Sequence, residues 1–338
     1  MTKQEKIDSY NPSGVGLDNG HLFGLPFEFE ESEIVVLPVP WEVTTSFGAG
    51  TSKAPQSILK ASSQLDLYHL DYPEAWKQGL YMLEVSEKIS RLNKQYLVKA
   101  NELILLQEKG RTIEELKNEI EEINEVCDHM RKWVFEQSSV LMNRGKKVIL
   151  LGGDHSTPLG YIQALAQKHK SFGILQIDAH ADLRKAYEGF EYSHASIMYN
   201  ALQLPEVTSL VQVGVRDICQ EEIDFINQDG RIHTYFEYRL KEYQFQGLNL
   251  KDQWLSAIDN LPQQVYVSFD IDGLDPSLCP NTGTPVPGGI DFNAAIYLLK
   301  LLKESGKEII GCDLNEVGKE EWDANVGARI LYQLCCHI

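Results

Sequence analysis

The sequence lacks any apolar run of about 18 residues, the length that a membrane-spanning helix needs. Its N-terminus, MTKQEKIDSYNPSG, also lacks the apolar segment of a secretory signal. Six cysteines are scattered without a C-x-x-C pair, in a chain too long to need disulfide staples. We therefore expect a cytoplasmic protein with reduced thiols and no membrane partner.

Positive charge is scarce as well: 31 Lys and Arg stand against 49 Asp and Glu, which gives a formal net charge of -18. Such a chain does not grip phosphate backbones or anionic lipid broadly, so we expect no nucleic-acid partner. A small cationic substrate would instead be attracted to it. Of the 338 residues, 43% are hydrophobic, enough for a substantial core and against global disorder.

Short apolar, β-branched runs recur along the chain, and each ends in a turn or a polar cluster: residues 34–39, 147–151, 172–177, 210–215, 265–269 and 308–312. Amphipathic stretches typical of helices lie between most of them, at residues 157–169, 221–228 and 293–305. This alternation predicts an α/β fold: a three-layer αβα domain, spanning residues 1–338, with a mainly parallel sheet. Ligands bind beyond the carboxyl ends of the strands in such sheets.

Residues 86–143 break the rhythm, because they contain two helical patterns and no strand signal. Lys109-Gly110-Arg111 separates the two patterns, so we expect a helical hairpin, with residues 85–125 as an approximate insertion in the domain. Thr112 and Glu115 have the spacing of a capping box at the start of the second helix. An apolar stripe then follows, including Ile120, Ile123 and Cys127. It could form a subunit interface or pack on the chain's own core.

Three of the predicted strands end in clusters of His and Asp: GGDHS at 152–156, DAHAD at 178–182 and DIDGLDP at 270–276. In an extended chain, residues two apart face the same side. Asp178, His180 and Asp182 therefore share a side, and Asp270 shares one with Asp272. For a single cluster, a helix-capping Asp or a core His is an equally good explanation.

Together the three clusters place four carboxylates in one cleft, where they cannot all stay ionised without cations. Two divalent ions would balance them, and this balance predicts a binuclear metal site. Carboxylate oxygens with imidazoles and no thiolate suit Mn²⁺, with Ni²⁺, Co²⁺, Fe²⁺ or Zn²⁺ as other possibilities. A two-metal site lowers the pKa of water and supports hydrolysis.

The motifs GGDHS, DAHADLR, SHAS at 193–196 and SFDIDGLDP, with the later Glu316, occur in the order seen in ureohydrolases: the chain resembles arginases, agmatinases and formimidoylglutamases over about residues 30–334. The resemblance implies that Asp178 and Asp270 bridge two metal ions. It implies that His155 and Asp182 complete one coordination shell, and His180 and Asp272 the other. It also implies a catalytic group: His194 as a proton shuttle and Glu316 as the carboxylate that binds the guanidinium, beside the metal-binding Asp182.

The loop LRKAYEGFEYSHAS, residues 183–196, is more similar to agmatinases than to arginases, whose loop grips an amino acid's head group. The leading expectation is therefore hydrolysis of agmatine to putrescine and urea. Formimidoylglutamase or arginase activity stays open, as does a non-catalytic role as a metal-binding oligomeric scaffold. Family members commonly form trimers or hexamers, so the resemblance also implies a homo-oligomer.

Overall fold

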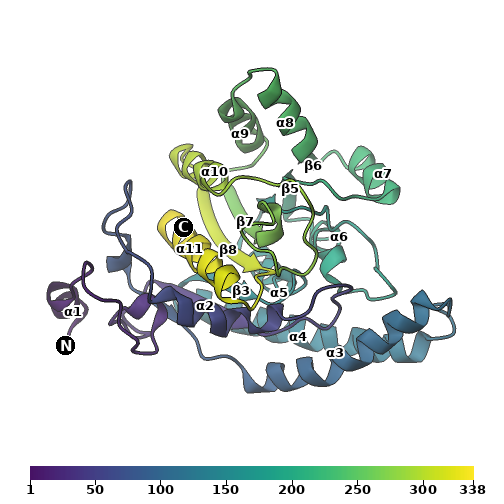
Figure 1. Cartoon of the computed structure of the whole chain (residues 1–338), viewed down its shortest axis with the longest axis horizontal. Helices are drawn as coiled ribbons and strands as arrows, with labels where there is room; N and C mark the ends of the chain where they lie inside the picture. Colours follow the sequence, from purple (N-terminus) through teal and green to yellow (C-terminus); the bar gives the residue numbers. More distant parts are fainter.

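The structure, a computed structural model that describes residues 1–338, contains one sheet of eight parallel strands in the order β2-β1-β3-β8-β7-β4-β5-β6 (Figure 1). Parallel neighbours cannot be joined by tight turns, so helices carry the chain back across both faces. The strands are β1 (Ile34–Val39), β2 (Leu80–Met82), β3 (Lys147–Gly152), β4 (Phe172–Ile177), β5 (Val207–Val213), β6 (Ile232–Tyr235), β7 (Gln264–Asp270) and β8 (Glu308–Asn315).

All six strands expected from the sequence are present, with small shifts at their ends. The largest shifts are of three residues, at the start of β5, Val207, and at the end of β8, Asn315. Strand β5 also ends early, at Val213, because Gly214 leaves the strand with a φ of 103°. Strands β2 and β6 were not predicted from the sequence. These edge strands have only 3 and 4 residues, too few to give a recognisable apolar run.

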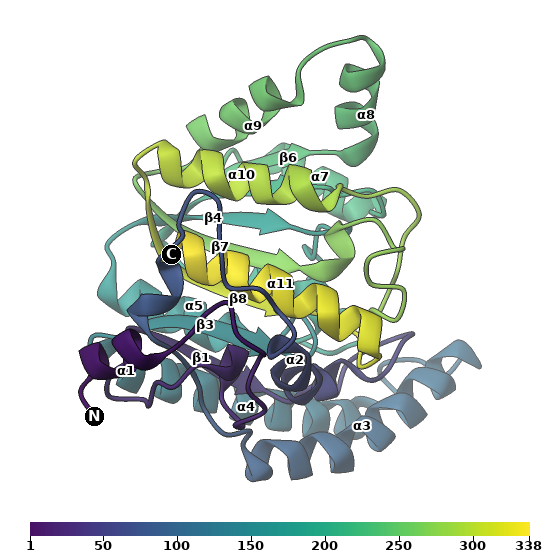
Figure 2. The same cartoon turned by 60° about the vertical axis from the view of Figure 1, so that its left-hand side comes forward.

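Side chains on the strands alternate between two separate hydrophobic cores, one on each face of the sheet. In β1, for example, Ile34 and Val36 belong to one core and Val35 and Leu37 to the other. In Figure 2, α10 and α11 lie in front of the sheet and α5 lies behind it. The three-layer αβα prediction is therefore confirmed.

The first core is covered by α2 (Ala54–Ser62), α9 (Leu250–Asp259), α10 (Phe292–Glu304) and α11 (Glu321–His337). The second is covered by α3 (Glu87–Glu108), α4 (Lys117–Asn143), α5 (Leu159–Lys168) and α6 (Ile197–Ala201). The remaining helices are α1 (Lys3–Ser9), α7 (Gln220–Gln228) and α8 (Glu237–Phe245). No helix is both long enough and apolar enough to span a membrane.

Helices α3 and α4 form the expected hairpin and lie side by side in both views (Figures 1 and 2). The apolar stripe of α4 is buried in the chain's own second core, where Ile120, Ile123 and Cys127 are at most 4% exposed. The stripe as a whole is therefore not available as a subunit interface. Four apolar side chains of the hairpin do remain exposed: Val98, Leu105, Ile113 and Val140.

The predicted start of the second helix was wrong. Thr112 and Glu115 do exchange the two hydrogen bonds of a capping box, but α4 begins at Lys117. Between them the chain forms a turn, in which the N–H of Leu116 donates to the carbonyl of Ile113 at 3.2 Å. This bond spans three residues, as in a tight turn, instead of the four of an α-helix.

Candidate metal centre and active site

The candidate site lies at the carboxyl ends of β3, β8, β7 and β4, which are the four central neighbours in the sheet. His155 follows β3, Asp178 follows β4, Asp270 ends β7 and Glu316 follows β8. Because parallel strands end at the same edge, three clusters that are far apart in sequence meet there. The structure brings all six predicted metal ligands into this region.

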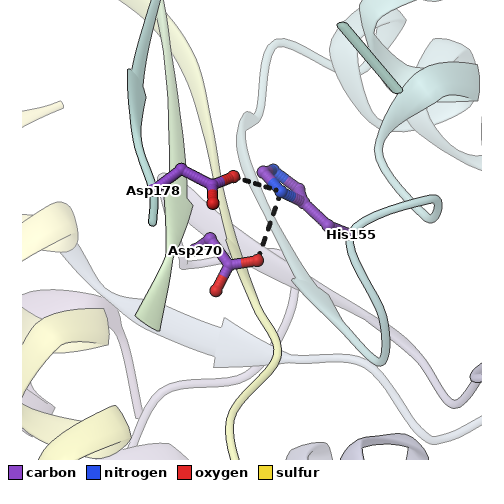
Figure 3. Close-up of side chains that lie close together, drawn as sticks. All are labelled: His155, Asp178 and Asp270. Carbon is purple, nitrogen blue, oxygen red and sulfur yellow. Dashed lines mark ion pairs between the residues drawn. The ribbon is translucent and has the colours of Figure 1, made fainter. Parts of the chain in front are cut away.

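His155 stands at the centre of the first group of ligands. Its Nδ1 lies 2.9 Å from Oδ2 of Asp178, 3.0 Å from Oδ2 of Asp182 and 3.2 Å from Oδ2 of Asp270. Figure 3 shows Asp178 and Asp270 pointing toward the imidazole from neighbouring strands. All four side chains are at most 6% exposed, so water does not compensate their charges.

His180 forms a second group with Asp272 and Asp178. Its Nδ1 lies 3.1 Å from Oδ2 of Asp272 and 3.6 Å from Oδ1 of Asp178. Asp178 thus turns one oxygen to each group, which is the arrangement that a bridging ligand requires. Asp270, the other bridge implied by the family resemblance, joins the His155 group only.

The donor atoms of the first group fit a cation. Nε2 of His155 is 2.9 Å from Oγ of Ser268, and that hydroxyl donates to Oδ1 of Asp313 at 3.1 Å. The serine oxygen therefore accepts a hydrogen bond from the protonated Nε2, which leaves a lone pair on Nδ1. This buried Nδ1 has no hydrogen-bond partner and faces three carboxylates. A metal ion satisfies such a set, because each of these atoms is an electron-pair donor.

Two of the carboxylates have raised pKa values, as expected for buried negative charges that nothing compensates. Burial and the nearby charge of Asp178 raise the pKa of Asp182 to about 7. Burial, Asp272 and Asp178 raise the pKa of Asp270 well above its usual range. Burial also disfavours the charge on Asp178, but the neighbouring imidazoles of His155 and His180 hold its pKa below the usual range. A cluster whose members resist ionisation together is stabilised by cations.

Backbone strain is concentrated at the site. Four non-glycine residues in the chain have positive φ angles, and two of them are Asp182, at 55°, and Glu316, at 59°. A non-glycine residue in this conformation costs roughly 1–3 kcal/mol and is often tolerated where a functional side chain needs a fixed direction. The close turn after β3 needs glycine, since a Cβ on Gly153 would lie 1.9 Å from the carbonyl oxygen of Trp41.

Glu316 is fixed to the backbone of the turn that carries His155. It is 3% exposed, and its Oε1 accepts the backbone N–H of His155 at 2.9 Å. Its Oε2 is buried and has no hydrogen-bond partner. Burial and the charge of Asp154 raise the pKa of Glu316 well above its usual range. One oxygen thus orients the side chain, and the other is left to accept a bond from a ligand.

A cavity of about 280 Å³ opens in front of His180 and Asp182. His194 lines it, and its ring contacts that of Tyr187 edge-on, with centroids 6.3 Å apart. Burial and the nearby imidazoles of His180 and His155 lower the pKa of His194 to about 4. Loops 183–196 and 281–289 both contribute to the wall, the second through Thr284, Pro285 and Val286. Glu316 does not line this cavity.

Four polar residues around the site were not predicted from the sequence. Ser268 and Asp313 orient His155, while Asp217 and Glu222 line the cavity. Ser268 could have been found, because it lies two residues before Asp270 on the same side of β7. Asp217 could have been predicted too, because it lies soon after the carboxyl end of β5. Glu222 could not have been predicted, because nothing in the sequence separates it from the other acidic residues in the first turn of α7.

A parallel αβα sheet whose central strands end in paired His and Asp clusters defines an α/β enzyme with a candidate binuclear metal centre. Residues 32–336 match the Arginase family, and the chain belongs to that family. It is a hydrolase of the ureohydrolase type, which acts on non-peptide C–N bonds of linear guanidino compounds.

Individual relatives agree with this assignment. The chain is 33% identical over 290 residues to an N(1)-aminopropylagmatine ureohydrolase of Thermus thermophilus, covering 86% of this chain and 84% of the relative. It is 29% identical over 294 residues to the agmatinase of Pyrococcus horikoshii, covering 86% and 85%. The crystal structure of agmatine ureohydrolase from Thermoplasma volcanium shares the fold, with a TM-score of 0.70, 23% identity and coverage of 99% and 97%.

Proposed function

We propose that the chain hydrolyses the guanidino group of agmatine or its N1-aminopropyl derivative and releases urea and an amine. The charge of the cavity wall carries this proposal. Arg184 is the one Lys or Arg on the wall. Its guanidinium already pairs with Glu222, with 3.8 Å between Nε and Oε2, and it lies over the ring of Tyr187. Asp217 is exposed on the same wall and has no ion pair. A substrate tail with an amine suits this wall better than one with a carboxylate.

The names of the relatives support the same substrate class. One is an N(1)-aminopropylagmatine ureohydrolase, and another is an agmatinase. Both names describe a guanidino compound whose other end carries amine groups. Either substrate would be further favoured by the overall charge of -18.

The proposed centre consists of His155, Asp178, His180, Asp182, Asp270 and Asp272 and holds two divalent cations, with Mn²⁺ the best match to its oxygen-rich ligands. When bound, such a pair supplies Lewis acidity and lowers the pKa of water. Asp178 lies between the two ligand groups and would set their separation.

The other residues would position the substrate and move protons. The free Oε2 of Glu316 would accept N–H groups of the planar guanidinium, and Oε1 keeps the carboxylate oriented through the backbone of His155. Hydrolysis adds OH to the guanidino carbon and H to the departing nitrogen. His194 lines the cavity beside His180 and would carry that proton to the nitrogen.

A substrate comparison tests the proposal. Agmatine, N1-aminopropylagmatine, 4-guanidinobutyrate, arginine and formimidoylglutamate are assayed with Mn²⁺ for urea, or for formamide with the last. Agmatine and 4-guanidinobutyrate differ mainly in the charge of the tail, so they form the critical pair. We expect the two guanidino amines to have the highest kcat/KM, and we expect Asp217→Asn to reduce that preference.

Other outcomes would point to the other functions. Best turnover of arginine or formimidoylglutamate would reject the amine-tail argument and identify an arginase or a formimidoylglutamase. No turnover of any compound, with metal bound, would favour the non-catalytic scaffold. Turnover of 4-guanidinobutyrate equal to that of agmatine would show that Asp217 does not select the tail.

We also propose that the chain is a single domain, with residues 85–125 as an insertion, and that it assembles as a trimer or hexamer. The exposed side chains of Val98, Leu105 and Ile113, at 58%, 51% and 46%, offer an apolar contact on the outside of the hairpin. Deleting the hairpin would remove core residues, so Val98→Glu with Leu105→Glu is the better test. We expect a lower mass by light scattering at unchanged melting temperature; an unchanged mass would place the interface elsewhere.

A further inference from the structure

A second hollow, of about 760 Å³, lies apart from the active-site cavity and shares no lining residue with it. Its walls come from the loop after β1, the start of α2, the first turns of α3 and Lys319 in the loop after β8. We call it the α2–α3 groove. Its volume is in the range of small-molecule sites in proteins, roughly 300–1,000 Å³.

The α2–α3 groove is positively charged, although the chain as a whole is strongly negative. Four exposed cationic side chains line it, and none of them forms an ion pair: Lys53, Arg91, Lys94 and Lys319. Cations that gather without carboxylate partners repel one another, and an anion between them removes that repulsion.

Two carboxylates also line the groove, Glu42 and Glu87. Glu42 is 3% exposed, and its oxygens are taken by the loop itself, through the N–H of Gly50 and the hydroxyls of Thr51 and Ser52. Glu87 is exposed in the first turn of α3. The cationic side chains still exceed the anionic ones by two, and the inner carboxylate is already satisfied.

The largely buried side chain of Asn93 also lines this groove. Asn93 is 4% exposed, and its Oδ1 accepts the backbone N–H of Glu42 at 2.7 Å. Its Nδ2, the donor end of the amide, makes no hydrogen bond to the protein, since the one side-chain bond of Asn93 is made through Oδ1. A donor that faces a groove without a protein partner is open to water or to a ligand. The inner wall and the rim therefore both present donors, which is the chemistry of an anion site.

We propose that the α2–α3 groove binds a small anion that carries phosphate. Lysines bind phosphate as point charges, and Arg91 offers a fork of N–H groups that matches two phosphate oxygens. The starts of α2 and α3 line the groove as well, and helix N-termini add partial positive charge. The shared chemistry is the phosphate group, whether it comes as inorganic phosphate or on a nucleotide. No candidate metal ligand takes part, so the proposal is independent of the proposed reaction.

Calorimetric titration of the full-length, metal-loaded protein tests this site, with inorganic phosphate, AMP and citrate as three separate probes. The test variant is Lys53→Gln with Lys94→Gln. The control is Lys60→Gln with Lys88→Gln, which removes the same charge from exposed, unpaired lysines of α2 and α3 that do not line the groove. These substitutions leave the core untouched.

We expect one phosphate or AMP to bind per chain, more tightly than citrate, and the test variant to bind about tenfold more weakly, since each exposed charge pair contributes a modest part of the affinity. The control should bind as the unmodified protein does. Tighter binding of AMP would identify a nucleotide as the source of the phosphate, and equal binding would identify inorganic phosphate.

Several results would overturn the proposal. One is that neither phosphate nor AMP binds to the unmodified protein. Another is that the test variant and the control lose phosphate affinity equally, and a third is that citrate binds as tightly as phosphate. A mass that rises with protein concentration and falls in the test variant, without anion binding, would instead make the groove an interface between copies of the chain. Asn93→Asp provides a further check: the added charge should abolish phosphate binding, and unchanged binding would contradict the role given to this donor.

Discussion

The carboxylate of Glu316 lies directly against the backbone of Gly283: a Cβ added to this glycine would be 2.7 Å from Oε2. That oxygen has no partner within the protein, while Oε1 is fixed by the N–H of His155. The glycine therefore leaves just enough room for the carboxylate that we propose binds the guanidinium. No candidate metal ligand is involved in this contact.

Gly283→Ala should consequently displace Glu316 and raise KM or lower kcat for agmatine, with a combined loss in kcat/KM of about 10²-fold, as misplacement by about 1 Å can cause. Metal content should stay the same, as measured by mass spectrometry of the purified protein. Gly230→Ala is the matched control, because a Cβ at Gly230 meets nothing within 4 Å. Unchanged kinetics in Gly283→Ala would argue against the role given to Glu316.

Removal of Asp178 should affect both ligand groups, because its two oxygens face different histidines. We expect Asp178→Ala to lose nearly all bound metal. Asp272→Ala, which lies in the His180 group only, should retain about one of the two ions expected for a binuclear site. Metal analysis of both variants after dialysis checks this. Equal metal content in the two would exclude a special position for Asp178.

Chelation should abolish activity, and Mn²⁺ should restore it better than Zn²⁺ or Ni²⁺, since four of the six proposed ligands are carboxylates. The measurement is urea release after dialysis against a chelator and after addition of each metal. Because the carboxylates repel one another when no cation is present, the melting temperature should fall on chelation as well. Full activity in metal-free protein would contradict the proposed mechanism.

His194→Ala should lower kcat by about 10²–10⁴-fold, the usual contribution of a positioned proton-transfer group. Metal content should be unchanged, since His194 belongs to neither ligand group. Steady-state kinetics combined with metal analysis test this prediction. Loss of metal together with activity would mean that His194 supports the centre instead of moving a proton.

The raised pKa of Glu188 should make the free energy of unfolding depend on pH. Burial, and then the charge of Glu108, raise the pKa of Glu188 from an ordinary value of 4.5 to about 7. The folded chain thus holds this proton more tightly than the unfolded chain, and the cost of ionisation grows as the pH rises from 4.5 to about 7. Glu188→Gln removes that cost, so it should stabilise the protein at pH 8 but not at pH 4.

Thermal melts at the two pH values measure the effect of Glu188→Gln. The gain at pH 8 should stay below about 1 kcal/mol, since Glu188 is only partly buried and solvent screens its charge. Glu191→Gln, an exposed position in the same loop, is the control. A gain of equal size at pH 4 would show that the effect comes from packing and not from the proton.

The central part of the fold could be predicted because its physical signal is local. A strand of a parallel sheet is buried on both faces, so β1, β3, β4 and β7 each appear as an apolar run. The polar residues that follow such runs meet at one edge of the sheet, so the encounter of His155 with Asp178 and Asp270 was predictable too. Short edge strands such as β2 have no comparable run.

Other features depended on how the elements pack in space. The stripe of α4 is equally compatible with a subunit interface and with the chain's own core, because periodicity identifies an apolar face but not what covers it. The contact of Gly283 with Glu316 and the gathering of Lys53, Arg91 and Lys319 join residues that are far apart along the chain. The sequence by itself determined the types of the longer elements and the His and Asp clusters that we propose bind metal. The tertiary structure decided which distant side chains touch, because such contacts depend on the packing of the whole chain.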